Sequence, residues 1–302
     1  MVLAILGPTG VGKSELAVFL AERLRGEVIN FDSLQFYRDL NIGTAKPSEE
    51  ERKGIPHHLF DILAPDEEFN AAKFVELADR VIREIRERNH LPILVGGTGL
   101  YLRAFEYGLF PVEVPEEIRK RVRTRAEENL TELYRELQEL DPEYAQKIGP
   151  KDRVRITRAL EVIYATSKPF SHFHREHPFF QKKRYNILKI GLVLPREELY
   201  QRINQRVLKM IEAGWVEEVR SLMKKGYGEE TKAFKAIGYK HILKYLKGEL
   251  SLDEAIRLIQ RDTRRYAKRQ LTWFKKEPEV HWFSPYDKEK ILSFVKKHLK
   301  ED

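Results

Sequence analysis

The stretch Gly7-Pro8-Thr9-Gly10-Val11-Gly12-Lys13-Ser14 decides the fold of this chain. The apolar run Val2–Leu6 precedes it, and apolar residues with helical spacing follow it. A strand, a glycine-rich turn and a helix in this order form a P-loop, in which backbone N–H groups and the helix N-terminus bind phosphate oxygens. We expect Lys13 to add a positive charge and Ser14 to bind a magnesium ion. The stretch predicts that phosphates bind, but not whose phosphates they are.

The bulk composition favours a soluble, folded protein. The chain has 302 residues, of which 42% are hydrophobic, and it contains no cysteine. Disulfides and thiolate metal sites are therefore excluded. No run of residues approaches the roughly 18 apolar residues of a membrane helix, and the first strand begins at Val2, which leaves no room for a targeting peptide. We expect a cytoplasmic protein with no membrane contact.

Charge is divided unevenly along the chain. Residues 1–113 hold 13 Lys and Arg against 18 Asp and Glu, whereas the remainder holds 42 against 29, and the net charge is +8. The basic part is suited to a large polyanion such as a nucleic acid. A well-solvated basic surface would give the same numbers.

The pattern of apolar segments predicts an α/β fold, a parallel sheet with helices on both faces. After the P-loop helix, strands are expected at 27–31, 92–95 and 187–194, with a short one at 58–63. Helical periodicity covers 71–88 and begins again at 100. In such sheets ligands bind beyond the carboxyl ends of the strands.

The character of the sequence changes after Pro111. Residues 116–128, 131–140 and 152–166 are helical in pattern with no strand between them, and 168–185 resembles a loop. Helices are expected again at 196–213, 215–225, 252–275 and 287–299. We therefore expect one core made of residues 1–113 and 186–302, interrupted by a helical insertion at 114–185.

Asp32 is the second candidate for chemistry. It ends the strand that we expect beside the P-loop strand, where a carboxylate can hold magnesium-bound water or accept a proton. A turn or capping role for an Asp-Ser pair is the alternative. The strand at 92–95 ends in Gly96-Gly97, where a P-loop NTPase carries an acid that holds magnesium. This absence argues against an ATPase or GTPase and for a transferase.

Two sets of basic side chains could meet the ligands. Arg202 and Arg206 share one helix face and could stabilise a leaving diphosphate, or they could be solvated. A second set could contact a phosphate backbone or form a solvated helix face: Arg257, Arg261, Arg264, Arg265, Lys268 and Arg269.

Several blocks in fixed order resemble the tRNA dimethylallyltransferase family, also called tRNA isopentenyltransferases. The blocks are 7–14, Asp-Ser-Leu-Gln-Phe-Tyr (32–37), Asn-Ile-Gly-Thr-Ala-Lys-Pro (41–47), Val-Gly-Gly-Thr-Gly-Leu-Tyr (95–101), Arg-Ala-Leu-Glu-Val (158–162), Gln-Arg-Val (205–207), Ala-Ile-Gly-Tyr-Lys (236–240) and Ala-Lys-Arg-Gln-Leu-Thr-Trp-Phe (267–274). They span nearly the whole chain. The resemblance implies a P-loop kinase-like core with an inserted helical domain, of the shorter bacterial type.

The resemblance also implies a reaction and its partners. The dimethylallyl group of dimethylallyl diphosphate would pass to N6 of the adenosine immediately 3′ of the anticodon, in tRNAs that read codons beginning with U. The anticodon stem-loop of tRNA, the isoprenoid diphosphate and Mg²⁺ are the expected partners of a monomeric enzyme.

Roles for single residues follow from the same resemblance. Asp32 would be the general base, and Thr9 and Arg206 would act with it in catalysis. The diphosphate or its magnesium would meet Gly7, Pro8, Thr9, Gly10, Val11, Gly12, Lys13 and Ser14. The tRNA would meet Asp32, Ser33, Leu34, Gln35, Thr98, Arg119, Val154, Arg155, Ile156, Thr157, Arg158, Lys235, Ala236, Ile237, Gly238, Tyr239 and Lys240.

Three other functions stay open. A related prenyltransferase could act on free AMP, ADP or ATP, although its substrate would not need a basic surface. A small-molecule P-loop kinase would transfer the γ-phosphate of ATP. A non-catalytic RNA-binding protein could use the P-loop as a nucleotide sensor, but Asp32 beside the phosphates argues against it.

Overall fold

The computed structural model describes residues 1–109, 112–176 and 182–301. The chain forms two compact units, one of residues 1–106 and 184–302 and one of residues 107–183. The sequence placed the bounds of the insertion at 114 and 185. None of the described helices is long and apolar enough to cross a lipid bilayer.

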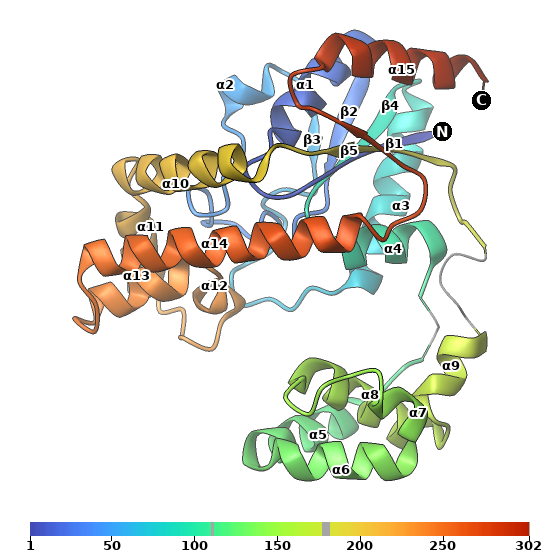
Figure 1. Ribbon diagram of the computed structural model, residues 1–302, viewed down its shortest axis with the longest axis vertical. Coiled ribbons are helices and arrows are strands. Elements are labelled where there is room, and N and C mark those ends of the chain that lie inside the picture. The colour runs from blue at the N-terminus through green and yellow to red at the C-terminus, as the bar shows by residue number, and fades with distance from the viewer. Residues whose placement is uncertain (110–111, 177–181, 302) are drawn as a thin grey trace. The chain divides into compact units, whose positions relative to one another are not determined.

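A six-stranded parallel sheet forms the centre of the first unit, in the order β3-β2-β4-β1-β5-β6 (Figure 1). Its strands are β1 (Val2–Leu6), β2 (Gly26–Asn30), β3 (His57–His58), β4 (Leu91–Val95), β5 (Ile187–Leu192) and β6 (Val280–Phe283). The four central strands are buried along their length, as parallel strands covered on both faces must be. The predicted α/β fold is confirmed.

Alternate side chains of β1 supply the two layers of the core. Leu3 and Ile5 pack in a cluster with α1 (Lys13–Leu24) and α15 (Lys288–Glu301). Val2, Ala4 and Leu6 pack in the other cluster, with α3 (Ala71–Glu87) and α4 (Gly99–Tyr107). The period of two along the strand thus explains why helices cover both faces of the sheet (Figure 1).

Six further helices complete the described part of this unit: α2 (Glu49–Arg52), α10 (Arg196–Glu212), α11 (Trp215–Lys224), α12 (Lys232–Lys235), α13 (Tyr239–Leu246) and α14 (Leu252–Phe274). α14 is the longest and packs against both α10 and α13. Ser251 begins it with a capping box that it forms with Glu254. α14 runs beside the sheet (Figure 1), so it can bring side chains to the strand ends.

The second unit is helical and has a core of its own. It contains α5 (Glu116–Glu128), α6 (Leu130–Leu140), α7 (Pro142–Ala145), α8 (Arg153–Thr166) and α9 (Phe170–Glu176). Val122, Leu137, Ile156 and Leu160 are among its fully buried residues. The pattern of apolar residues predicted α5, α6 and α8 to within one residue at each end.

Some predicted elements were wrong. The strand expected at 58–63 is only the two residues of β3, and Leu63 makes an isolated bridge to Tyr37. Residues 170–176, expected in a loop, form α9, because Phe170 is buried against Tyr144. Local sequence pattern did not predict α2 (Glu49–Arg52), α7, α12, α13 or β6, which are short and whose residues mix polar and apolar types.

The strand that ends at Asp32 is not beside the P-loop strand, contrary to our expectation. β4 lies between β2 and β1, so the Gly96-Gly97 turn lies between Asp32 and the P-loop. A Cβ atom on Gly96 would lie 2.6 Å from the backbone carbon of Phe31. Glycine is therefore required there, and this close approach brings the ends of β2 and β4 together.

Glu27 at the start of β2 is a buried carboxylate with three partners. Its oxygens accept hydrogen bonds from Arg88 at 2.8 and 2.9 Å and lie 2.6 Å from His58 Nε2 and 2.7 Å from His90 Nδ1. These contacts, led by the Arg88 hydrogen bonds, lower the pKa of Glu27 to about 2. The ionised carboxylate thus stabilises the folded state.

This arrangement predicts how stability changes with pH. A carboxyl whose pKa is lower in the folded than in the unfolded state contributes stability above about pH 4.5, and the contribution is lost as the pH falls toward 2. Between pH 7 and pH 3 we expect a loss of about 2 kcal/mol from this group. Urea unfolding of the wild type and Glu27→Gln at pH 7 and pH 3 measures it. A Glu27→Gln protein that loses as much stability on acidification as the wild type would contradict the assignment.

Candidate active site

The P-loop closes tightly at the end of β1. Gly10 and Gly12 have φ values of +82° and +103°, which residues with a side chain rarely adopt. A Cβ on Gly7 would lie 2.8 Å from the carbonyl oxygen of Leu192 in β5. Lys13 Nζ donates to the carbonyls of Gly7 and Pro8, both at 3.0 Å. The Lys13 side chain is thus folded back over the P-loop.

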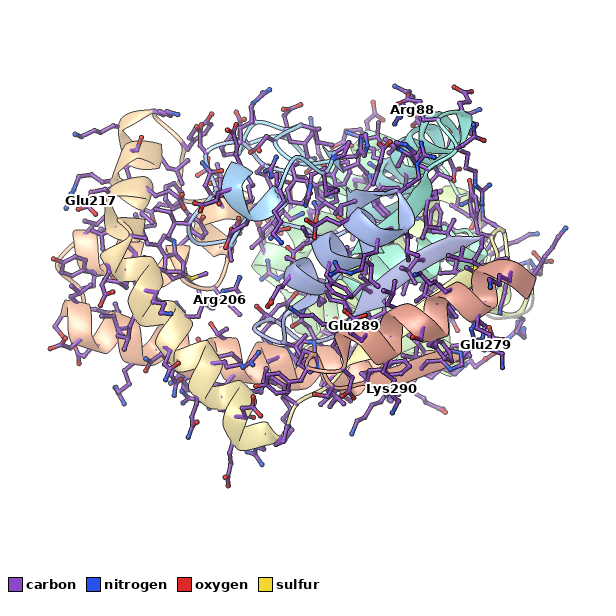
Figure 2. The ribbon with its side chains drawn as sticks, turned by 90° about the horizontal axis from the view of Figure 1, so that it is seen from above. Arg88, Arg206, Glu217, Glu279, Glu289 and Lys290 are labelled. Carbon is purple, nitrogen blue, oxygen red and sulfur yellow. The ribbon has the colours of Figure 1, made fainter. Side chains whose placement is uncertain are left out.

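Three buried or half-buried cations, Lys13, Arg206 and Lys232, lie within electrostatic range of one carboxylate, Asp32. Burial lowers the pKa of Lys13 to about 8, while the charge of Asp32 raises it and that of Arg206 lowers it. Burial also lowers the pKa of Arg206 and of Lys232, and Asp32 again acts in the opposite direction. Figure 2 shows Arg206 on the side of α10 that faces the α/β core. An anion bound among these cations would offset the cost of burying them.

Asp32 is held rigidly at the end of β2. Its backbone N–H donates to Asn30 Oδ1 at 2.7 Å, and its Oδ1 accepts from the Leu34 N–H at 3.1 Å. The charge of Asp32 contributes to the raised pKa values of Tyr101 and Tyr266, which are due mainly to burial. The charge of Asp32 therefore acts on the cations and on these two phenols, and the structure brings the predicted Asp32, Lys13 and Arg206 into one charged region.

Gln270 of α14 links the P-loop to the turn after β4. Its Oε1 accepts from the Thr9 N–H at 2.8 Å, and its Nε2 donates to the Gly97 carbonyl at 3.1 Å. The side chain lies where a Cβ on Gly97 would be, 2.1 Å from Nε2. Gln270 thus occupies the space at the end of β4 where a P-loop NTPase carries the acid that holds magnesium. The next residue, Thr98, accepts from the Ser33 N–H at 3.0 Å and so ties this turn to the segment after Asp32.

We expect Gln270 to set the position of the P-loop relative to Asp32. Gln270→Leu removes both hydrogen bonds and leaves the Thr9 N–H and the Gly97 carbonyl unpaired, which costs about 1–3 kcal/mol for each group. Turnover should fall about 10-fold or more. Gln270→Glu keeps the acceptor for Thr9 and should lose less.

Steady-state rates of these variants, compared with Gln201→Leu on the exposed face of α10, measure the effect. If Gln270→Leu and Gln201→Leu turn over equally fast, Gln270 has no positioning role.

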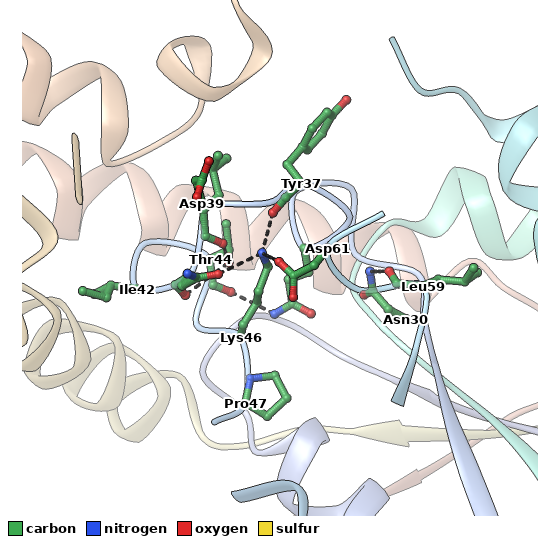
Figure 3. Close-up of polar contacts among 12 residues, drawn as sticks. Asn30, Tyr37, Asp39, Ile42, Thr44, Lys46, Pro47, Leu59 and Asp61 are labelled. Carbon is green, nitrogen blue, oxygen red and sulfur yellow. Dashed lines mark hydrogen bonds and ion pairs between the residues drawn. The ribbon is translucent and has the colours of Figure 1, made fainter. Parts of the chain in front are cut away.

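The loop after Asp32 is built by buried polar contacts (Figure 3). Lys46 Nζ donates to the Tyr37 carbonyl and to Asn41 Oδ1 at 3.0 Å, and it pairs with Asp61 at 2.5 Å. Gln35 Nε2 donates to the carbonyls of Thr44 and Ala45 at 2.9 and 3.3 Å. The amide of Gln35 therefore supports the loop, and the predicted contact of Gln35 with a nucleotide stays a prediction.

Glu218 of α11 explains why two of the sequence blocks belong together. Its carboxylate accepts from the N–H groups of residues 41–43 at 2.7 to 3.2 Å and from the Tyr239 hydroxyl at 2.6 Å. Tyr239 is fully buried and packs edge-on against Trp215. The block 236–240 therefore fixes the loop 41–47.

The prediction that Tyr239 contacts RNA is wrong for its side chain. It is also wrong for the side chain of Ile156, which lies in the core of the second unit. The side chain of Val11 is likewise buried, so the P-loop offers only its backbone there. Lys235 is exposed and Lys240 is half-buried. Their expected contacts with RNA, like those of Leu34, Ala236, Ile237 and Gly238, stay predictions.

In the second unit, Arg119 and Arg158 lie close together. The charge of Arg119 lowers the pKa of Arg158, after the larger effect of burial. Arg158 pairs with Glu161 at 3.6 Å, whereas Val154 and Arg155 are exposed on the first turn of α8. Thr157 Oγ1 donates to the Arg153 carbonyl at 2.8 Å. Arg119 in turn pairs with Glu116 at 3.7 Å. Each of the two neighbouring guanidinium groups thus lies beside a carboxylate, and their contact with a phosphate stays a prediction.

The candidate basic helices are partly neutralised. Arg202, four residues from Arg206, donates to the Tyr286 hydroxyl at 2.5 Å and pairs with Glu198 at 3.5 Å. Arg264 donates to Asn204 Oδ1 at 2.6 Å and so joins α14 to α10. Arg257, Arg265, Lys268 and Arg269 are exposed. Of the two arginines proposed on α10, only Arg206 belongs to the charged site.

No group of three or more His, Cys, Asp and Glu side chains that could hold a metal ion occurs among the described residues. Ser14 is exposed on the first turn of α1, beside Lys13. A metal ion at this position would take most of its ligands from phosphate oxygens and water, as magnesium does. The donor set therefore fits a metal that arrives with a phosphorylated substrate.

Comparison with known proteins identifies the family. The family model described as IPP transferase matches residues 35–277. The chain belongs to this family. The match begins at Gln35, three residues after Asp32, and it includes Thr98, Arg206 and Gln270.

Curated members of the family are similar along nearly their whole length. tRNA dimethylallyltransferase 1 of Citrifermentans bemidjiense is 52% identical over 93% of this chain and 91% of its own, and tRNA dimethylallyltransferase of Acetivibrio thermocellus is 47% identical over 99% and 97%. The predicted family and the predicted class of enzyme, a transferase, are confirmed.

Solved structures agree with the fold. A full-length tRNA isopentenylpyrophosphate transferase from Bacillus halodurans is 40% identical with a TM-score of 0.75, covering 99% of this chain and 97% of its own. A eukaryotic dimethylallyltransferase described as acting on tRNA is 29% identical with a TM-score of 0.87, covering 99% and 79%.

The sequence did not single out three residues of this site: Lys232, Tyr266 and Gln270. Lys232 lies in a region without clear periodicity. Tyr266 and Gln270 lie on the helix that we regarded as a basic surface. The block 267–274 was a signal for Gln270, because a buried glutamine in a charged helix needs partners.

Proposed function

We propose that this enzyme transfers a dimethylallyl group from dimethylallyl diphosphate to N6 of the adenosine immediately 3′ of the anticodon in tRNAs reading codons that begin with U. The observation that carries the proposal is the placement of one carboxylate, Asp32, among Lys13, Arg206 and Lys232, with glycine and Gln270 where an ATPase has its acid. Names of the similar proteins support the choice of tRNA and of a dimethylallyl donor.

The reaction needs a base and a stabilised leaving group. The N6 amine attacks C1 of the dimethylallyl group, the bond from C1 to the diphosphate oxygen breaks, and a proton leaves N6. Conjugation with the purine ring makes this amine a weak nucleophile. Asp32 accepts the proton as the new C–N bond forms.

The diphosphate leaves into the cationic end of the site. Lys13, Arg206 and the N–H groups of the P-loop offset the charge that develops on the leaving oxygen. The Ser14 hydroxyl would hold a magnesium ion, which would supply further positive charge to the leaving diphosphate. The Thr9 N–H donates to Gln270 Oε1 at 2.8 Å, so it positions the P-loop and does not bind the diphosphate.

The RNA must present the adenosine out of its stacked loop. This extrusion costs a few kcal/mol, and contacts of Arg119, Arg158 and Lys235 with the phosphates of the anticodon stem-loop offset it. We expect the enzyme to act as a cytoplasmic monomer.

The substrate can be tested by competition. With labelled dimethylallyl diphosphate, magnesium and equal concentrations of unmodified tRNA and AMP, we expect label in tRNA and little in AMP. If AMP carries most of the label, the chain is an adenylate prenyltransferase. If neither carries label and γ-labelled ATP passes its phosphate to an acceptor, it is a kinase.

A further inference from the structure

One exposed aromatic side chain lies directly beside the reaction centre and has no role in the chemistry above. Trp273 of α14 is 38% exposed, whereas Trp215 is buried. It follows Gln270 by three residues, so both project from one side of the helix. Gln270 contacts Gly97, and Trp273 contacts Gly99, two residues further along the same turn.

The indole lies against the backbone at the start of α4. A Cβ on Gly99 would lie 2.1 Å from Trp273 Nε1 and 2.2 Å from Cδ1. Asp32 Oδ2 lies 3.8 Å from the corresponding point on Gly97. The exposed indole is therefore separated from the proton acceptor by one short turn of backbone, close to the place of the target base without occupying it.

The orientation of the indole is fixed before any ligand binds. The Arg103 guanidinium lies 4.6 Å from the centre of the Trp273 ring. Arg103 Nε in turn donates to Glu277 Oε1 at 3.1 Å, and the Glu277 carboxylate is fully buried. A cation held in this way keeps the ring in one orientation. Little conformational entropy remains to be lost when a second flat group stacks on the ring.

The surroundings of the indole are apolar and basic. Leu100 on the first turn of α4 is 46% exposed. Arg269, four residues before Trp273, shares its side of α14, and Lys276 follows the end of the helix; both are exposed. An aromatic face bordered by cations is the arrangement with which proteins hold unpaired bases of single-stranded nucleic acid.

We propose that Trp273 is a stacking platform for the nucleobase next to the target adenosine, with Arg269 and Lys276 contacting the phosphates beside it. This rests on the proposed function, in which the target base is extruded toward Asp32. Extrusion separates the target from its neighbours, so the adjacent base loses a stacking partner. Trp273 replaces that partner and stabilises the opened loop.

Equilibrium binding of an unmodified anticodon stem-loop RNA tests the platform. A stacked base contributes about 1–3 kcal/mol by alanine substitution. We therefore expect Trp273→Leu, which keeps apolar bulk, to bind the RNA about 10-fold more weakly, and Trp273→Phe to bind within about 3-fold of the wild type. Leu208→Ala on α10, an equally exposed apolar residue, is the control and should bind as the wild type does. Thermal unfolding of each variant shows that it is folded.

RNA with an abasic site separates stacking from a general effect. Removing the base on the 5′ or the 3′ side of the target should weaken binding to the wild type, and for one of the two sides it should abolish the difference between wild type and Trp273→Leu. The KM for dimethylallyl diphosphate should not change. Trp273→Leu that binds RNA like the wild type, or a difference that persists with both abasic RNAs, overturns the platform.

A spectroscopic readout uses Trp273→Phe. RNA should quench the tryptophan emission of the wild type, and this quenching should be lost in the variant, which keeps Trp215 and Trp282. Equal quenching in both proteins contradicts stacking on Trp273. Failure of the proposed function is distinct from these outcomes, because the wild type would then leave the RNA unlabelled.

Discussion

Asp32→Ala is expected to turn over at least about 100-fold more slowly than the wild type, the lower range for the loss of a general base. RNA binding should persist, because the cations and the second unit are unchanged. Single-turnover rates at saturating RNA and donor measure the chemical step directly. If Asp32→Ala turns over nearly as fast as the wild type, Asp32 is not the general base.

Asp32→Asn separates the base from the turn. An Asn side chain can still accept from the Leu34 N–H, as Asp32 Oδ1 does at 3.1 Å, but it cannot take up the proton of N6. We expect Asn to be nearly as slow as Ala. If Asn restores the rate, Asp32 serves the turn only. Because removing the negative charge also lessens repulsion of the donor, the KM for dimethylallyl diphosphate should stay equal or fall.

Arg206→Ala should lower turnover about 100-fold, the range for losing one donor to a developing negative charge. Arg206 lies in the charged site with Asp32 and Lys13, and burial lowers its pKa. Water therefore does not take the place of the guanidinium when the side chain is removed. Added magnesium should relieve the defect only in part, since a metal on the diphosphate does not take the place of a guanidinium fixed on α10.

Arg202→Ala is the matched control, four residues away on the same helix. Arg202 is held by Tyr286 and Glu198 outside the charged site, so we expect its turnover within about 3-fold of the wild type, as for most surface substitutions. If the two alanine variants turn over equally fast, Arg206 is a solvated residue on the surface of α10 and has no role in catalysis.

The sequence could predict those parts of the fold that depend on local pattern. The P-loop, the central strands and the long amphipathic helices follow from the order of apolar and glycine residues. β6, α12 and α13 could not be found in this way, because they are short and are stabilised by packing against distant segments. Local pattern also could not predict the order of the strands in the sheet. It therefore could not show that β4 lies between Asp32 and the P-loop.

The site was predictable where a side chain acts on the ligand and less so where it acts through another residue. Asp32, Lys13 and Arg206 follow from motif and resemblance, and the structure brings them together. Tyr239 lies in a block of the same resemblance, yet it is buried and holds Glu218 and the loop 41–47. Gln270 joins segments 261 residues apart in the chain. Only the folded structure shows such contacts.

The central claim is that the P-loop of this enzyme holds a leaving group, so that carbon–oxygen and not phosphorus–oxygen bonds break. The most direct test incubates the enzyme with dimethylallyl diphosphate labelled in its isoprenoid, magnesium and unmodified tRNA, then locates the label by nucleoside mass spectrometry and measures the phosphate product. We expect one label on N6 of the adenosine 3′ of the anticodon and one intact diphosphate released for each label. Inorganic phosphate as the product, or label on any other nucleoside, would contradict it.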